Sequence, residues 1–162
     1  ITRAPTAELV AVGALVMGVD PYEDRLVEAR RRCGDSAVFA WAELHALPAE
    51  LLRGRFDVVY SSPGALEEVL DAGRWTAGIG AALRQGGQLV LNDVHPGTAL
   101  LDHALRWRRS YFEGGFVRLG QIVTGLAEAG LRITRLDELP PHERRLGDPR
   151  VPARLLLTAD KL

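Results

Sequence analysis

The chain has 162 residues, a formal net charge of −1 and 47% hydrophobic residues, which is typical of one globular domain with a real core. This charge balance argues against a nucleic-acid partner, because there is no strong basic field to neutralise phosphates. The single cysteine, Cys33, excludes an intrachain disulfide framework and a cysteine zinc cluster. No apolar run approaches the roughly 18 residues of a membrane span. We therefore expect a cytoplasmic enzyme or binding domain, without a metal site or a membrane partner.

The first half of the chain alternates short apolar runs with segments of helical pattern. A helix is predicted over 5–11, a strand over 14–19, a helix over 21–32 and a strand over 37–41. A short helix around 49–52, a strand over 56–60 and a helix from Trp75 to Leu83 follow, the last ended by a glycine cap at Gly86. A strand over 88–92 completes this series. Such alternation indicates βαβ units and a parallel sheet buried on both faces.

The pattern changes after residue 97. Residues 98–109 predict a helix, and an amphipathic stripe from Leu119 to Ala127 predicts another that stops at Gly130. Strands are predicted over 131–136 and 154–159, separated by a proline-rich stretch, 139–152, without a strong helix. Two strands that lack a crossover helix run antiparallel. The sheet is therefore expected to close with an antiparallel hairpin.

Polar residues stand at the carboxyl ends of three predicted strands. Asp20 ends the first, Ser61-Ser62 follow the third, and Asn92-Asp93 with His95 follow the fourth. Ligands of open α/β sheets bind at this edge. The sequence thus predicts a binding crevice there.

Motifs in this order resemble those of class I S-adenosylmethionine-dependent methyltransferases: Gly18-Val19-Asp20, residues 42–48, residues 56–60 and Leu83 to Gly87. Residues 60–66, His95-Pro96 and Tyr111-Phe112 resemble a bacterial small-molecule subgroup of that family. The resemblance implies a doubly wound, Rossmann-like α/β fold with the strand order 3-2-1-4-5-7-6. It also implies S-adenosylmethionine as cofactor, S-adenosylhomocysteine as product and a small-molecule methyl acceptor.

The resemblance also implies roles for the first crevice residues. Asp20 would bind both ribose hydroxyls, with Pro21 beside it. From the residues alone, Asp20 is equally a helix N-cap, with Pro21 at the first helical position and Glu23 in a capping box. A carboxylate has acceptor positions for both tasks.

Further cofactor contacts follow from the same resemblance. Glu43 stands where the family usually carries an Asp that accepts from the adenine amino group, and Leu44 would cover the adenine face. A solvated turn acid and an ordinary core leucine are the alternatives. Ser61 and Ser62 would line the methionine portion, or else only form the turn before Pro63-Gly64.

Methyl transfer from a sulfonium is an in-line displacement that depends on positioning and the exclusion of water, so no obligatory catalytic motif exists. His95 is the best available proton acceptor if the acceptor must lose a proton, although a lone His is more often structural. Trp107, Tyr111 and Phe112 are expected to wall an apolar substrate pocket, or to be core or lid contacts.

One family motif has no counterpart in this sequence. The glycine-rich loop after the first strand should stand before Ala4 or Pro5, where only Ile1-Thr2-Arg3 are found. Without that central strand, a gap of about twice the ~4.8 Å strand spacing would open in the sheet. We expect residues 1–162 to form one methyltransferase domain whose first strand and glycine loop are missing, with a further missing segment near 115–116.

Two other functions fit the same pattern. A nicotinamide-dependent Rossmann oxidoreductase also places an acid after its second strand, but it needs a glycine-rich turn and lacks the closing hairpin. A non-catalytic nucleoside-binding domain of the same fold is the second alternative. The sequence predicts neither the acceptor nor the oligomeric state.

Overall fold

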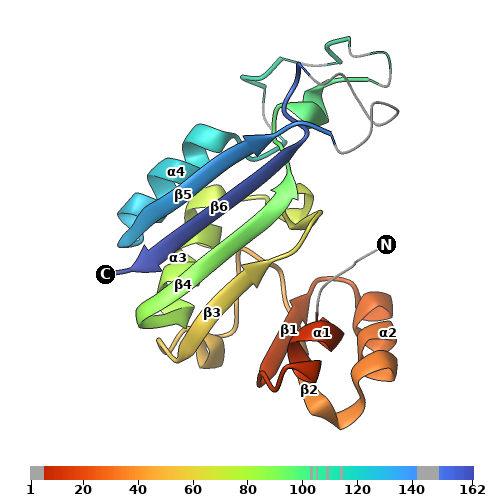
Figure 1. Ribbon diagram of the computed structural model, residues 1–162, viewed down its shortest axis with the longest axis vertical. Helices are drawn as coiled ribbons and strands as arrows, with labels where there is room; N and C mark the ends of the chain where they lie inside the picture. The colour runs from red at the N-terminus through yellow and green to blue at the C-terminus, as the bar shows by residue number, and fades with distance from the viewer. Residues whose placement is uncertain (1–5, 103, 105, 109, 114, 142–149) are drawn as a thin grey trace.

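The computed structural model describes residues 6–102, 104, 106–108, 110–113, 115–141 and 150–162 (Figure 1). Helices and strands alternate through the first half of the chain and then give way to a helix and a hairpin. In chain order they are α1 (Thr6–Ala11), β1 (Val16–Asp20), α2 (Glu23–Cys33), β2 (Ala37–Trp41), β3 (Phe56–Ser61), α3 (Ala72–Ala82), β4 (Leu83–Val94), α4 (Leu119–Glu128), β5 (Leu131–Leu139) and β6 (Arg154–Lys161). Short 3-10 turns lie at η1 (Gly34–Ser36), η2 (Ala49–Leu51), η3 (Ala65–Glu68) and η4 (Thr98–Leu100).

The strands form two sheets. In the smaller sheet β1 pairs with β2 in parallel; in the larger one the order is β3-β4-β6-β5. There β3 and β4 are parallel, whereas β6 runs antiparallel to both β4 and β5. The α/β class and the closing antiparallel hairpin are thus confirmed. The ladders of the described residues, β1-β2 and β3-β4-β6-β5, agree with the corresponding parts of the expected order.

The sheet is interrupted between β1 and β3. Within the described residues, β1 pairs only with β2 and β3 only with β4, so each of these two strands has one edge without a ladder partner (Figure 1). Val58 of β3 is consequently 53% exposed, although it belongs to an apolar run.

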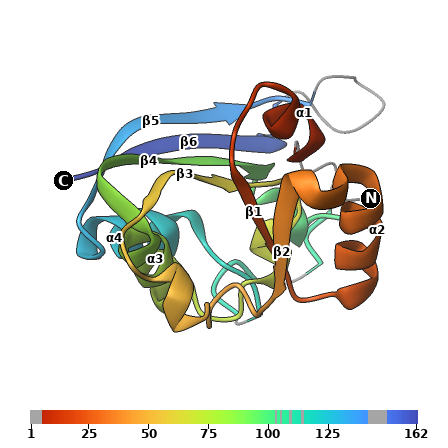
Figure 2. The ribbon, with the colours of Figure 1, turned by 90° about the horizontal axis from the view of Figure 1, so that it is seen from below.

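The core lies between the larger sheet and two helices. Alternate residues of β4 and β6 point to one face, where Leu89, Leu91, Leu155 and Leu157 are fully buried. The helices α3 and α4 cover that face (Figure 2), burying apolar side chains that include Trp75, Ile79, Ile122 and Leu126. This packing makes the larger sheet a rigid base for the loops at its carboxyl end.

Glycines allow α3 and α4 to approach closely. A Cβ atom on Gly80 would lie 2.7 Å from the backbone oxygen of Ala129 and 3.0 Å from its Cβ. A Cβ on Gly125 would collide with the Thr76 hydroxyl. Gly120, near the start of α4, has open space instead.

Gly80→Ala is therefore expected to lower the free energy of unfolding by up to about 2 kcal/mol. The clash with rigid backbone costs about 1–3 kcal/mol, which the better helix propensity of Ala offsets by about 1 kcal/mol. Gly120→Ala makes the same change without a clash and is expected to stabilise the protein by up to about 1 kcal/mol. Urea denaturation measures both variants; equal effects would contradict close packing at Gly80.

Three predictions about where helices begin and end are wrong. The helix predicted through Leu83 ends at Ala82, and Gly86, with φ of 70°, lies within β4, where the pairing with β3 shifts register, rather than at a helix end. Helix α2 begins at Glu23 with Tyr22 as N-cap, so Asp20 forms no capping box. Instead, Asp20 Oδ1 accepts from the Tyr22 amide at 2.9 Å.

The helix predicted over 98–109 is absent from the described residues of that segment. Only η4 and an isolated bridge between Leu101 and Trp107 form there. The Asp102 carboxylate accepts from the amides of Ala104 and Arg106, and this local bonding competes with helix formation. Most of the proline-rich stretch 139–152 lies outside the described residues.

Candidate functional site

A cavity of about 340 Å³ lies between the two sheets, close to the lower end of the size range of ligand sites. The ends of β1 and β3 contribute Asp20 from one side and Ser61 and Ser62 from the other. The cavity also extends along the unpaired edges, where Met17 and Val58 line it. It thus combines a polar end at the carboxyl edge of the strands with an apolar part between the strands.

Asp20 provides the carboxylate at this polar end. Its Oδ1 accepts the Tyr22 amide and lies 3.8 Å from Arg25 Nη1. Among the described residues these interactions use Oδ1, so Oδ2 can still accept from a ligand hydroxyl. Burial raises the pKa of Asp20, while the Tyr22 amide and the Arg25 charge oppose this shift.

Pro21 and Leu44 also line the cavity, whereas Glu43 is not among its lining residues. The Pro21 carbonyl accepts from the indole Nε1 of Trp41 at 2.8 Å, which ties the turn after β1 to the end of β2. Leu44 packs against the main core as well as facing the cavity. The contact expected between Glu43 and an adenine ring remains a prediction.

A buried acid holds the loop that carries the serines. Asp93 in β4 is 2% exposed, and its carboxylate accepts from three backbone amides: Gly64 at 2.7 Å, Leu66 at 2.9 Å and Val94 at 2.6 Å. Gly64 has φ of 93°, a conformation that suits glycine. Asp93 thereby fixes the path of the chain from Ser61 into η3. Burial raises the pKa of this carboxyl, although the three amides act in the opposite direction.

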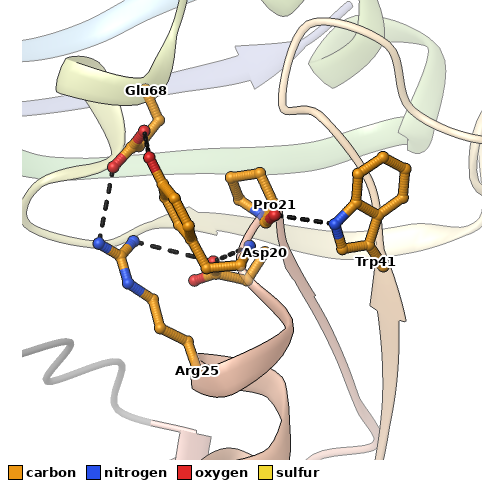
Figure 3. A network of polar contacts seen from close by, with 6 residues as sticks. Asp20, Pro21, Arg25, Trp41 and Glu68 are labelled. Atoms are coloured by element: carbon orange, nitrogen blue, oxygen red, sulfur yellow. Dashed lines mark hydrogen bonds and ion pairs between the residues drawn. The ribbon is translucent and has the colours of Figure 1, made fainter.

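Two charged cavity residues were not expected from the sequence. Arg25 lies in the first turn of α2 and Glu68 at the end of η3, and Arg25 Nη2 is 3.6 Å from Glu68 Oε1 (Figure 3). No sequence pattern predicts that Arg25 and Glu68 meet, because they are 43 positions apart and lie on opposite sides of the interruption in the sheet. Asp93, expected at the edge of the crevice, does not line the cavity and is buried instead, in phase with Leu89 and Leu91 of β4.

His95 is buried, with 8% exposure, but does not line this cavity. Its Nδ1 accepts from the Gly97 amide at 3.0 Å, so the neutral ring carries its proton on Nε2. That nitrogen lies 2.8 Å from Glu138 Oε1. Both ring nitrogens are therefore engaged within the protein, and a catalytic role for His95 remains a prediction.

The three expected substrate aromatics do not line the cavity. Trp107 and Phe112 are 69% and 81% exposed, and Tyr111 makes edge-to-face contacts with Phe112 and Phe116 at 5.6 and 5.9 Å between centroids. Tyr111 instead faces a second, open groove beside α4, with Arg118 and Gln121. Contact of Trp107, Tyr111 and Phe112 with a substrate remains a prediction.

The described residues contain no cluster of three or more His, Cys, Asp or Glu side chains suited to a metal ion. Nor does any described helix combine the length and apolar character needed to cross a bilayer.

No protein-family model matches the sequence, and no curated protein matches it. Solved structures, by contrast, match over almost the whole chain. A Listeria monocytogenes protein provisionally classed as an S-adenosylmethionine-dependent methyltransferase has a TM-score of 0.77 at 17% identity, covering 97% of this chain and 85% of that one. An S-adenosylmethionine-dependent methyltransferase from Mesorhizobium loti has a TM-score of 0.73 at 24% identity, covering 91% and 80%.

A third neighbour carries ligands. The Burkholderia thailandensis 1,6-didemethyltoxoflavin-N1-methyltransferase, solved with 1,6-didemethyltoxoflavin and S-adenosylhomocysteine, has a TM-score of 0.63 at 20% identity, covering 98% of this chain and 66% of that one. Because all three identities are below 25%, these structural matches establish the fold alone. The activity has to be argued from the residues of the site. The chain has the fold of the class I S-adenosylmethionine-dependent methyltransferases.

Proposed function

We propose that the cavity binds S-adenosylmethionine and that the protein transfers its methyl group to a small-molecule acceptor. The observation that carries this proposal is the position of Asp20. It is a partly buried carboxylate at the carboxyl end of β1, across the cavity from Ser61 and Ser62 at the end of β3. The likeness to methyltransferases of known structure supports the same function.

The donor set fits this cofactor. Asp20 can accept from two ribose hydroxyls, because its Oδ2 accepts no hydrogen bond from the described residues. Pro21 and Leu44 offer apolar surface for the adenine ring, and the turn at Ser61 and Ser62 offers polar groups for the amino-acid portion. The small-molecule acceptor is supported by the neighbour solved with 1,6-didemethyltoxoflavin.

The chemistry demands positioning rather than a reactive side chain. When bound, S-adenosylmethionine supplies a sulfonium methyl group that an acceptor takes by in-line displacement, with S-adenosylhomocysteine as the other product. The protein must then hold the nucleoside at Asp20 and keep water from the reacting centre. Asp93 serves this requirement by fixing the loop beside the serines.

Calorimetry with S-adenosylhomocysteine and with NADH tests the binding part of the proposal. We expect S-adenosylhomocysteine to bind and NADH to give no heat of binding. Binding of NADH but not of S-adenosylhomocysteine would instead favour the nicotinamide-dependent oxidoreductase. Screening candidate metabolites for a methyl-dependent mass gain then tests transfer; cofactor binding without any such gain would favour a non-catalytic nucleoside-binding domain.

We also propose that a further strand completes the domain between β1 and β3. The unpaired edges of β1 and β3 need hydrogen-bond partners, and the apolar part of the cavity lies between them. The intact mass of the protein from its natural source tests this: we expect a value above the 17.7 kDa of the present sequence. A mass of 17.7 kDa would exclude the added strand. Peptide mapping of the same natural protein would show whether a further segment lies near 115–116.

A further inference from the structure

Arg25 joins a carboxylate at the end of the smaller sheet to one in the turn that follows the first strand of the larger sheet. Its Nη1 is 3.8 Å from Oδ1 of Asp20, at the end of β1, and its Nη2 is 3.6 Å from Oε1 of Glu68, in η3 beyond β3 (Figure 3). All three side chains line the cavity. Since β1 and β3 share no ladder in the described part of the chain, this bridge connects the two halves of the site.

The guanidinium of Arg25 is itself held in place. It lies over the Tyr22 ring, with Cζ 4.2 Å from the ring centroid. The Tyr22 hydroxyl donates to Glu68 Oε2 at 2.7 Å, so the same tyrosine also fixes the second carboxylate. These contacts restrict a long side chain that would otherwise sample many rotamers.

We propose that Arg25 is a positioning residue that orients the Asp20 carboxylate toward the ribose hydroxyls of the ligand, while Glu68 and Tyr22 hold Arg25. This inference rests on the proposed function, which assigns Asp20 to the ribose. At 3.8 Å the guanidinium attracts Asp20 without forming a short bidentate pair. The carboxylate is thus oriented while its lone pairs stay available to a ligand.

The charges around Asp20 explain why a cation is needed there. Burial raises the pKa of Asp20, and the nearby carboxylates of Glu68 and Asp24 act in the same direction. Arg25 opposes them, together with the hydrogen bond from the Tyr22 amide. Loss of Arg25 is therefore expected to raise the pKa of Asp20 and to remove the charge that orients its carboxylate toward the ligand.

The ligand-free protein provides the first test. In an NMR titration of the side-chain carboxyls, Arg25→Met is expected to raise the pKa of Asp20 above its wild-type value, whereas Arg25→Lys, which keeps the charge, shifts it less. Arg30→Met is the matched control, because Arg30 lies on the same helix and pairs with Glu23 on the surface. An Asp20 pKa that is the same in wild type and Arg25→Met would overturn the proposal.

A double-mutant cycle provides the second test. Arg25→Met is expected to weaken S-adenosylhomocysteine binding about 10-fold at pH 7 in the wild-type background and less than about 2-fold in an Asp20→Asn background. Arg30→Met is expected to change neither value. The same loss in both backgrounds would show that Arg25 does not act through Asp20.

The two proposals fail differently. If the wild-type protein does not bind S-adenosylhomocysteine, the proposed function fails, but the NMR titration still decides whether Arg25 controls the ionisation of Asp20. If the wild type binds the ligand and Arg25→Met behaves like Arg30→Met in both experiments, the positioning role fails and the proposed function stands.

Discussion

Asp20→Asn is expected to weaken S-adenosylhomocysteine binding by about 100-fold with little change in thermal stability. Hydrogen bonds to a charged acceptor contribute about 1.5–3 kcal/mol each, and two ribose hydroxyls would use this carboxylate. An asparagine amide offers one acceptor oxygen and a donor group that cannot accept from a hydroxyl. A loss of about 2.7 kcal/mol corresponds to the 100-fold change.

The fold tolerates this substitution because the local structural task of Asp20 is modest. The side chain accepts from the Tyr22 amide through a single oxygen, which asparagine also possesses. Asp20→Asn therefore keeps the hydrogen bond to the Tyr22 amide while it weakens the contact with the ligand. Calorimetry measures the affinity and a thermal melt measures the stability.

Asp71→Asn is the matched control. Asp71 is the N-cap of α3, accepts from the Arg74 amide at 2.9 Å and does not line the cavity. We expect its affinity for S-adenosylhomocysteine to equal that of the wild type. If Asp20→Asn also bound the ligand with wild-type affinity, the cavity would not hold a ribose at Asp20.

Much of the fold could be predicted because the strands are short apolar runs with clear ends. The apolar runs before Asp20, before Ser61 and around Leu89 are typical of buried strands. The proline-rich connection before Arg154 argues against a crossover helix. These local signals were sufficient for the antiparallel closing hairpin. The interruption between β1 and β3 was expected only from the strand order that the family resemblance implies.

The parts that could not be predicted depend on contacts distant in sequence. Arg25 and Glu68 meet only because η3 turns back toward α2, and no periodicity encodes such a turn. In residues 98–109, helical propensity misleads because the Asp102 side chain bonds to nearby amides. Trp107 and Phe112 look like pocket walls from composition, yet the described chain leaves both exposed.

Asp93→Ala is expected to lower the free energy of unfolding by about 3 kcal/mol or more. The substitution leaves the amides of Gly64, Leu66 and Val94 without their acceptor, and an unsatisfied buried donor costs about 1–3 kcal/mol. Asp57→Ala is the control on the adjacent strand, because Asp57 is exposed and its surface pair with Arg84 contributes less than about 1 kcal/mol. Urea denaturation compares the variants; equal losses would contradict the anchoring role of Asp93.

The effect of Asp93→Ala should extend to the ligand. The loop that Asp93 anchors leads from Ser61 and Ser62 to Glu68, all of which line the cavity. Loosening this loop is expected to weaken S-adenosylhomocysteine binding even at temperatures where the variant is fully folded. A destabilised variant with unchanged affinity would show that the loop keeps its path without Asp93.

The pH dependence of the free energy of unfolding shows how ionisation of Asp93 affects the folded protein. Burial raises its folded-state pKa above the usual value of about 3.8, so the folded protein binds more protons than the unfolded chain just above that pH. The contribution of this carboxyl to stability therefore falls as the pH rises from 3.8 through the folded-state pKa, and then becomes constant. Asp93→Asn cannot titrate and lacks this slope. The stability of the wild type minus that of Asp93→Asn, measured by urea denaturation from pH 3 to 7, should thus decrease with rising pH; an increase would mean that the three amides outweigh burial.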